Sequence, residues 1–256
     1  EITRRDVYGL LPAVGQAGPY QPLTSPTEEN VVLAVTKFGG TEDLTLEAVA
    51  NDDLNALQSI PRDLAMAAVR TRYEDVFNLL KGTGATMDYD TTVLFHTDHK
   101  NKGTTALSWD ALNTGINTMG EQTPLSGAAA SLSVVPKYLV VPNELASLSR
   151  QIFTGDFETE PGTAGVMNPN TLKGSVAPII VNYWTDATDW YLVADPAQWD
   201  TIAMAVLRGH EDPVILIQSD PTVGSVFTAD KTTIKVRDIR NQDVLDHRSF
   251  FGAVVA

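Results

Sequence analysis

The sequence predicts an α+β protein, and three observations support this fold class. A long stretch has apolar residues at helical spacing, several short apolar runs are typical of strands, and the two kinds of element follow one another irregularly. A regular alternation of strands and helices, which would favour a doubly wound α/β sheet, is not apparent. With 256 residues, 43% of them hydrophobic, the chain is long enough for one sizeable core or for two lobes.

Residues 1–28 are expected to form an extended arm. Four prolines and three glycines leave no room in this segment for a regular element of useful length. Scattered apolar residues, among them Tyr8 and Tyr20, are sufficient to attach the arm to another surface. A disordered tail is the other interpretation of the same composition.

Residues 29–50 are expected to form a β-hairpin that turns at Gly39 and Gly40, because glycine favours the positive φ of a tight turn. This turn would place Val35 opposite Leu44 and gather apolar side chains on one face. Either the chain's own body or another subunit has to cover that face. The residues of the apolar face are Val31, Leu33, Val35, Leu44, Leu46 and Ala48, and near the tip Lys37 would lie opposite Glu42, beside Phe38.

Residues 60–81 are expected to form a long helix. Apolar residues recur along this stretch at helical spacing, Pro61 suits the first turn, and Gly82 suits the end. Such a helix would be ~33 Å long at 1.5 Å per residue. We interpret it as a structural spine.

Two shorter helices and several strands are expected after this spine. The helices are predicted at residues 108–122, with Ser108 as N-cap, and at residues 142–153, with a proline in the first turn. The predicted strands are Tyr138–Val141, Ile179–Tyr183, Trp190–Val193, Ile202–Leu207, Val214–Ile217 and Thr233–Val236.

Composition excludes several classes of function. The chain has 32 acidic and 18 basic residues, a formal net charge of -14, and no Lys/Arg-rich run, so sequence-specific nucleic-acid binding is not expected. The absence of cysteine excludes disulfides, thiolate metal sites and cysteine nucleophiles. No apolar run approaches the ~20 residues that span a bilayer.

Two polar segments have residue types that can carry chemistry. HTDHKN, residues 96–101, brings two imidazoles close to Asp98, which is a pattern for metal binding. Asp156, Glu158 and Glu160 alternate in the loop Thr154–Asn170, where carboxylates can hydrolyse glycosides or hold calcium.

Neither segment has a complete ligand pattern, and we interpret them as a hydrogen-bonded loop and a solvated acidic loop. His210 and His247 are isolated, with no predicted partner. The sequence also lacks a GxSxG motif and a phosphate-binding glycine loop. We therefore assign no catalytic, cofactor-binding or metal residues, and expect no cofactor. A carbohydrate- or metal-binding enzyme that uses these two segments is the alternative function.

Five stretches, taken in their order and spacing, carry a family resemblance. They are NDDLNALQSIPRDLAMAAVRTRYEDVFNLL (51–80), LFHTDHKN (94–101), PKYLVVPNELASLSRQIF (136–153), WYLVADPAQWDTIAMAVLRGHEDPVI (190–215) and IKVRDIRNQDVLDHRSFF (234–251). The chain resembles the major head subunits of tailed bacteriophages. In particular, it is similar to Mu-like prophage head proteins and to capsid proteins made fused behind a prohead protease.

The resemblance implies a Hong Kong 97-type capsid fold. Residues 1–28 would be the N-terminal arm and residues 29–50 the extended loop. Residues 51–105 and 221–256 would form the peripheral domain with its spine helix, and residues 106–220 the axial domain.

The resemblance also implies a structural protein and not an enzyme. The chain would assemble with itself into hexamers and pentamers of a head in the virion, built in the host cytoplasm, with portal, scaffold or cement proteins as partners. Packaged double-stranded DNA would be enclosed without specific binding, with no role for a membrane. The residues implied in contacts between subunits are Val31, Leu33, Val35, Lys37, Phe38, Leu44, Leu46, Tyr8 and Tyr20.

Three further expectations follow from the resemblance. In some relatives a lysine of the extended loop forms an isopeptide bond with an asparagine. We interpret Lys37 instead as the cross-strand partner of Glu42, because no partner asparagine or catalytic acid can be matched. The first residue is Glu1, which is expected if an N-terminal scaffold or protease segment is removed. Excess negative charge is expected on the inner wall, where it would repel packaged DNA.

Overall fold

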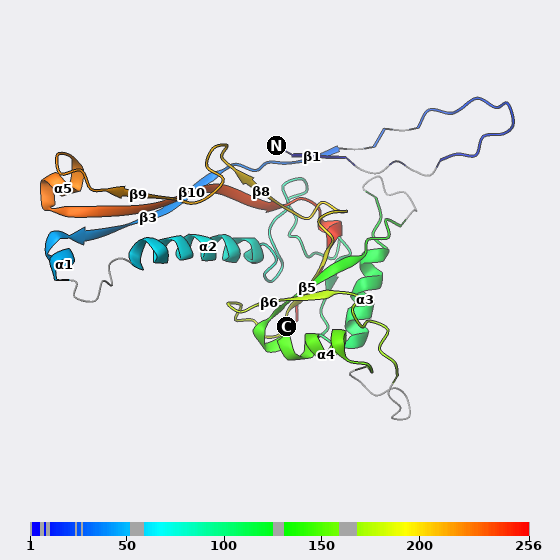
Figure 1. Cartoon of the computed structure of the whole chain (residues 1–256). Coiled ribbons are helices and arrows are strands. Elements are labelled where there is room, and N and C mark those ends of the chain that lie inside the picture. The colour runs from blue at the N-terminus through cyan, green and yellow to red at the C-terminus, as the bar shows by residue number, and fades with distance from the viewer. Residues whose placement is uncertain are drawn as a thin grey trace. The chain divides into compact units, whose positions relative to one another are not determined.

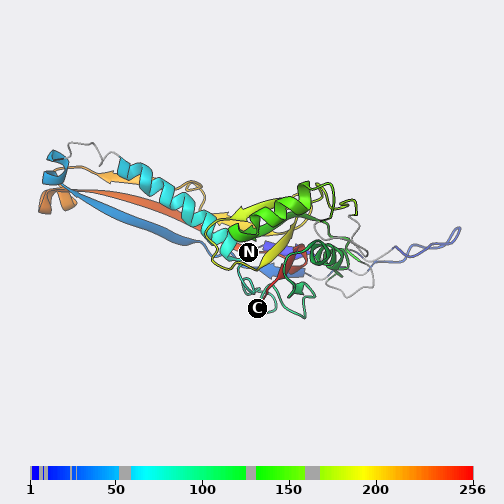
Figure 2. The ribbon, with the colours of Figure 1, turned by 90° about the horizontal axis from the view of Figure 1, so that it is seen from below.

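The structure is a computed structural model that describes residues 2–5, 8, 11–23, 25–26, 28–51, 59–124, 131–158 and 168–255 (Figures 1 and 2). The chain divides into two compact units. The first comprises Glu1–Val32, Phe77–Ala203 and Val244–Ala256, and the second comprises Leu33–Val76 and Met204–Asp243. Each unit combines helices with strands, as the sequence predicted. The predicted domain boundaries at 105/106 and 220/221 do not coincide with this division.

The first unit is built on a sheet that has five strands among the described residues. Their order is β4 (Lys102–Gly103), β11 (Phe250–Ala253), β7 (Trp190–Ala194), β5 (Pro136–Pro142) and β6 (Ala177–Val181). β7 is antiparallel to β11 and β5, whereas β4 and β6 run parallel to their neighbours. Three of the strands predicted from sequence are thus neighbours in one sheet.

Helices α3 (Trp109–Gly120) and α4 (Ala146–Thr154) belong to the same unit. Ser108 caps α3 as predicted, since its side-chain oxygen accepts a hydrogen bond of 3.1 Å from the backbone nitrogen of Ala111. A Cβ at Gly115 would lie 3.0 Å from Phe251 and 3.1 Å from Leu192, so α3 packs closely on the sheet. The turn η2 (Asn143–Leu145) leads from β5 into α4, and η3 (His247–Ser249) precedes β11.

Both faces of this sheet are covered by apolar side chains. Trp190 and Leu192 of β7 pack in one cluster with residues of α3 and α4. Tyr191 and Val193, which point to the opposite face, pack in a second cluster with Phe95 and its neighbours in the segment before β4. Burial of both faces explains why β7 is apolar along its whole length and does not alternate.

The N-terminal segment contains a short two-stranded sheet. β1 (Ile2–Arg5) pairs antiparallel with β2 (Glu28–Val31), with Ile2 opposite Val31. The prediction that residues 1–28 hold no regular element is therefore wrong at both ends. The prolines that motivated it lie between positions 12 and 26, and so leave Ile2–Arg5 free to pair. Among the described residues 8, 11–23 and 25–26 there is no helix or strand.

The second unit is a four-stranded sheet with helices. β10 (Lys231–Val244) pairs antiparallel with β3 (Thr36–Thr45) along one edge, while β8 (Ile202–Val206) and β9 (Val214–Gln218) pair with it on the other side. The helix α2 (Ile60–Asn78) runs alongside this sheet in both ribbon views. α2 confirms the helix predicted at residues 60–81 and ends three residues earlier than expected, because residues 79–81 form a turn and a bend.

The predicted hairpin within residues 29–50 is wrong. β3 passes straight through Gly39 and Gly40, which lie opposite Arg237 and Val236 of β10 and lack the positive φ of a turn. A Cβ at Gly39 would lie only 2.5 Å from the carbonyl oxygen of Val236. Glycine at this position therefore permits a close approach of two strands and does not make a bend.

Two smaller predictions depended on that hairpin and are corrected with it. Val35 precedes β3 and does not lie opposite Leu44, whose partner is Thr232. Lys37 and Glu42 lie in the same strand, so they are not cross-strand partners. Lys37 instead lies opposite Ile239.

Candidate functional site

The predicted contact residues of the N-terminal segment differ in exposure. Tyr8 is half-exposed, and the side chain of Tyr20 is 89% exposed. Val31, in contrast, is 1% exposed because its own chain covers it. Tyr8 and Tyr20 are therefore available to another molecule, and the side chain of Val31 is not.

The predicted contact residues of the second unit do not lie on one face of the sheet, although the predicted hairpin would have placed most of them together. Phe38 and Leu44 are partly buried and occupy the sheet face that also carries Asp238. Lys37 is exposed on the opposite face of β3. Leu46 lies beyond the strand in α1 (Leu46–Ala50), where 63% of it is exposed.

One end of the second unit presents a cluster of exposed apolar side chains. There α1 and α5 (Gly224–Ala229) lie together (Figure 1). The backbone nitrogen of Leu46 donates to the carbonyl oxygen of Asp230 at 3.0 Å. Phe227 of α5 is 72% exposed. We call this the apolar tip, and its residues are Leu46, Val49, Val223 and Phe227. Of these four residues, only Leu46 was among the contact residues predicted from the sequence. The six-residue helix α5 is too short to give a periodic signal.

Helix α2 also exposes apolar side chains. Every residue of α2 is described and none is buried. Met66, Val69 and Tyr73, whose spacing helped to predict the helix, are all exposed. An exposed apolar surface of this extent is typical of a site that another protein covers.

A buried ionic network joins α2 to β10. Arg72 donates from Nε and Nη2 to the two carboxylate oxygens of Asp238, both at 2.7 Å. Asp238 also accepts from Nε of Arg240 at 2.9 Å, and the side chain of Arg240, which is fully buried, donates to Asp75. The hydrogen bond from Arg72 is the main reason why the pKa of Asp238 is lowered. Desolvated charges of this kind require good geometry, which makes the network a precise link between helix and strand.

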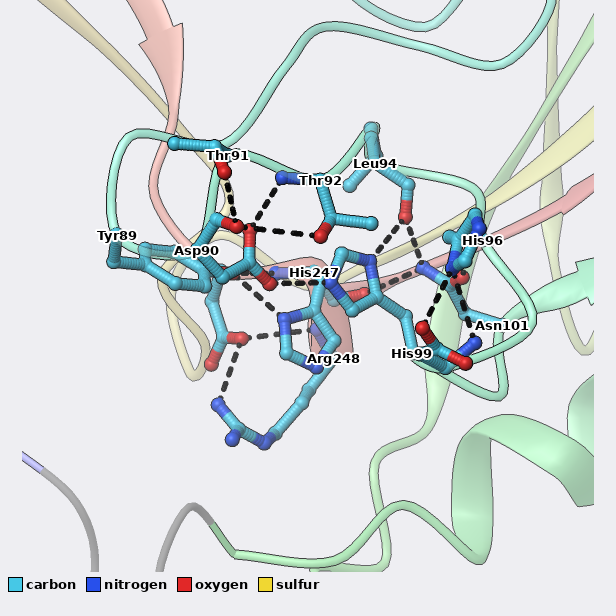
Figure 3. A network of polar contacts seen from close by, with 12 residues as sticks. Tyr89, Asp90, Thr91, Thr92, Leu94, His96, His99, Asn101, His247 and Arg248 are labelled. Atoms are coloured by element: carbon cyan, nitrogen blue, oxygen red, sulfur yellow. Dashed lines mark hydrogen bonds and ion pairs between the residues drawn. The ribbon is translucent and has the colours of Figure 1, made fainter.

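The HTDHKN segment forms the hydrogen-bonded loop that the sequence predicted (Figure 3). The Nδ1 atom of His99 lies 2.9 Å from the carbonyl oxygen of Leu94, and its Nε2 atom lies 2.7 Å from a carboxylate oxygen of Asp90. His96 accepts at Nδ1 from the backbone nitrogen of Asp98. Both ring nitrogens of His99 thus lie within hydrogen-bond distance of an oxygen atom, which fixes the position of the ring.

His247 is not isolated, contrary to the prediction. Its ring stacks on that of His99 with centroids 4.0 Å apart, and its Nδ1 atom lies 2.7 Å from the hydroxyl oxygen of Tyr89 (Figure 3). Asn101 donates from Nδ2 to the carbonyl oxygens of both Leu94 and His247. The HTDHKN segment and the segment that contains His247 are thus held together inside the first unit. His210 is partly buried in a turn, where its backbone nitrogen donates to the carbonyl oxygen of Leu207.

The described part of the acidic loop engages its carboxylates locally. Asp156 forms an ion pair with Lys173, which lowers the pKa of Asp156, and Glu158 accepts from the side chain of Asn168 at 3.0 Å. Glu160 lies outside the described residues. Within the described part of the chain, no three His, Cys, Asp or Glu residues are grouped so that they could hold a metal. No helix in that part is long and apolar enough to cross a membrane.

The fold has counterparts among solved capsids. The chain is similar to the capsid of a native GTA particle (TM-score 0.61, 11% identity, 100% of this chain and 84% of that one). It is also similar to the capsid of cyanophage P-SCSP1u (TM-score 0.60, 10% identity, 99% and 83%) and to that of Myoviridae phage XM1 (TM-score 0.57, 11% identity, 100% and 85%). At these identities the likeness concerns the fold.

Sequence comparison gives the family. None of the curated proteins matches the chain. The family model described as phage capsid protein matches residues 28–251, which is most of the chain. The chain therefore belongs to the phage capsid protein family.

Proposed function

We propose that the chain is the major capsid subunit of a tailed-phage head, which assembles into hexamers and pentamers and encloses double-stranded DNA. The observation that carries the proposal is the apolar surface that the described chain leaves uncovered, above all the apolar tip and the exposed face of α2. In a member of a capsid family, copies of the same chain are the natural cover for such a surface.

The proposed contacts between copies are revised from those expected. They retain Tyr8 and Tyr20 in the N-terminal segment and Val35 and Leu46 in the second unit, and they omit the buried Val31. Leu33, Phe38 and Leu44 are partly buried and contribute less, and Lys37 contributes charge. Burial of a few hundred Å² of apolar surface at ~25 cal/mol per Å² stabilises a contact by several kcal/mol before the cost of association.

The domain names are also part of the proposal. We assign the second unit, with α2 as spine, to the peripheral domain, and the sheet of the first unit to the axial domain. The long segment closed by β1 and β2 would be the extended loop. The prohead-protease-fused, Mu-like branch of the family is proposed from the five sequence stretches that resemble it.

The remaining partners follow from assembly of a head. The subunit would act in the virion after assembly in the host cytoplasm, in contact with portal, scaffold or cement proteins. A net charge of -14 would favour an acidic inner wall that repels packaged DNA. The proposed role is structural and needs no catalysis.

Sedimentation velocity and negative-stain microscopy of the purified chain test the proposal. Closed shells of many copies are the expected result. Phe227→Asp, which places a charge in the apolar tip, should prevent their formation. The matched control is Phe157→Asp, a change of another exposed phenylalanine outside the proposed contacts, which should leave shells intact. A chain that stays monomeric at all concentrations would contradict the proposal.

A further inference from the structure

The sheet of the second unit has α2 against one of its two faces. Val236, Asp238 and Arg240 of β10 are buried. Asp238 binds Arg72 of α2, and Arg240 binds Asp75 of the same helix. Because strand residues alternate between faces, the odd-numbered positions of β10 point to the other face. We call this other face of the sheet the outer face, and Gly39 lies on it.

A group of cations surrounds Gly39 on the outer face. Gly39 lies opposite Arg237 and Thr41 lies opposite Lys235, while Lys37 is two residues before Gly39 on the same strand face. These side chains and the backbone between them line a hollow of about 470 Å³. We call it the cationic hollow.

The cations of the cationic hollow have no ion-pair partner among the described residues, and Asp43 on the same strand face accepts from Thr233 instead. Lys37, Lys235 and Arg237 form no ion pair or side-chain hydrogen bond with a described residue. On the α2 side of the same sheet, by contrast, Arg72 and Arg240 are both paired with carboxylates. Three unpaired cations side by side in a chain of net charge -14 mark a place for an anionic partner.

The absence of a side chain at Gly39 keeps the cationic hollow open. A Cβ at Gly39 is prevented by the carbonyl oxygen of Val236 at 2.5 Å, so no side chain separates Lys37 from Arg237 on this face. β3 is also an edge strand, since no described strand pairs with its outer edge. The hollow is therefore open both from the face and from the edge, which admits an extended segment of another molecule.

We infer that the cationic hollow binds an acidic segment of a second copy of this chain. The inference rests on the proposed function and names the chemistry of one contact. Two copies that each carry a charge of -14 repel one another, and assembly requires places where cations of one copy meet acids of the next. A neighbouring copy, with 32 acidic residues, presents many candidate partners.

DNA is the less suitable occupant of the hollow. Three cations would release only about three counterions from a duplex, which gives weak binding. The acidic surface of the rest of the chain would oppose even that contact. An acidic segment of a neighbouring copy would pair with the three cations. It would do so without bringing a long polyanion close to the acidic residues of the chain.

Zero-length cross-linking of assembled particles tests the inference directly. Particles grown from a mixture of ¹⁴N-labelled and ¹⁵N-labelled chains would be treated with a carbodiimide, which joins an amine to a carboxylate that touches it. Mass spectrometry should find peptides of mixed label that join Lys37 or Lys235 to an aspartate or glutamate. Untreated particles are the control for any native isopeptide bond at Lys37. Mixed-label links elsewhere, with none from either lysine, would overturn the inference.

Charge reversal gives a second, independent measurement. Lys235→Glu should raise the protein concentration needed for assembly by at least about tenfold, and added salt should reduce the difference between variant and wild type. The matched control is Arg208→Glu, an exposed turn residue of the same unit outside the hollow, which should change that concentration by less than about threefold. Circular dichroism would show that both variants fold.

The outcomes separate the inference from the proposed function. Shells that form equally well with Lys235→Glu overturn the inference and leave the proposed function standing. The same conclusion follows if Lys235→Glu abolishes binding to a duplex DNA fragment while assembly is unchanged. A wild-type chain that forms no shells overturns both.

Discussion

Arg72 of α2 and Asp238 of β10 form a two-pronged ion pair, with both nitrogen–oxygen distances at 2.7 Å. The side chain of Asp238 is only 4% exposed, and on its other side it accepts from Arg240. Among the described residues of the second unit, Ile234 and Val236 are the buried apolar ones, so buried polar contacts such as this pair are prominent in it. Removal of one partner would leave a desolvated charge, which is costly.

Arg72→Ala should destabilise the second unit by about 3–5 kcal/mol, because it leaves a buried carboxylate with one partner fewer. Chemical denaturation followed by circular dichroism measures this change. Arg70→Ala, an exposed arginine on the same helix, is the control and should stay within about 0.5 kcal/mol of wild type. Equal effects of the two substitutions would show that the network does not hold α2 in place.

The same pair predicts how stability depends on pH. The pKa of Asp238 is lowered below its ordinary value of 3.8, so its contribution is present above pH 3.8 and is lost as the pH falls through the folded-state pKa. The free energy of unfolding should therefore fall below pH 3.8, and less steeply in Asp238→Asn. Denaturation midpoints between pH 2 and 6 for both proteins check this prediction. Identical slopes would contradict the role of the carboxylate.

Gly39 and Gly40 offer a matched pair of substitutions. Gly39→Ala should destabilise the protein by about 1–3 kcal/mol, because its Cβ would meet the carbonyl oxygen of Val236 at 2.5 Å. At Gly40 a Cβ would meet nothing within 4 Å, so Gly40→Ala should be neutral or stabilise by up to about 1 kcal/mol. Thermal unfolding of the two variants distinguishes a continuous strand from a turn, in which both substitutions would be costly.

Contacts at both ring nitrogens should make His99 important for the stability of the first unit. Chemical denaturation of substituted proteins measures this contribution. His99→Ala should cost about 1–3 kcal/mol, since it leaves the carboxylate of Asp90 without this partner. The exposed His96 serves as control, and His96→Ala should cost under about 0.5 kcal/mol. Equal losses of stability in the two variants would contradict this role of His99.

Local signals explain which parts of the fold the sequence predicted. The spacing of apolar residues and the flanking proline and glycine located α2, and the serine before Trp109 located α3, because helices are stabilised by contacts between residues close in sequence. The apolar runs of β5 and β7 were equally clear, since both of their faces are buried.

Pairing between distant segments explains the predictions that failed. Gly39 and Gly40 fit a turn as well as a strand, and only the presence of β10 across from them decides for the strand. His247 appeared isolated because its partners, Tyr89 and His99, lie far from it in the sequence. The cationic hollow was hidden for the same reason, because Lys37 meets Arg237 only when β3 and β10 pair.

The central claim is that surfaces left open by one chain are covered by other copies of it. Electron cryo-microscopy of the purified assembly tests this most directly. The account predicts a closed shell in which Tyr20, Leu46 and Phe227 are each buried against a neighbouring subunit. A particle without neighbouring copies, or a shell in which these three side chains face solvent, would contradict it.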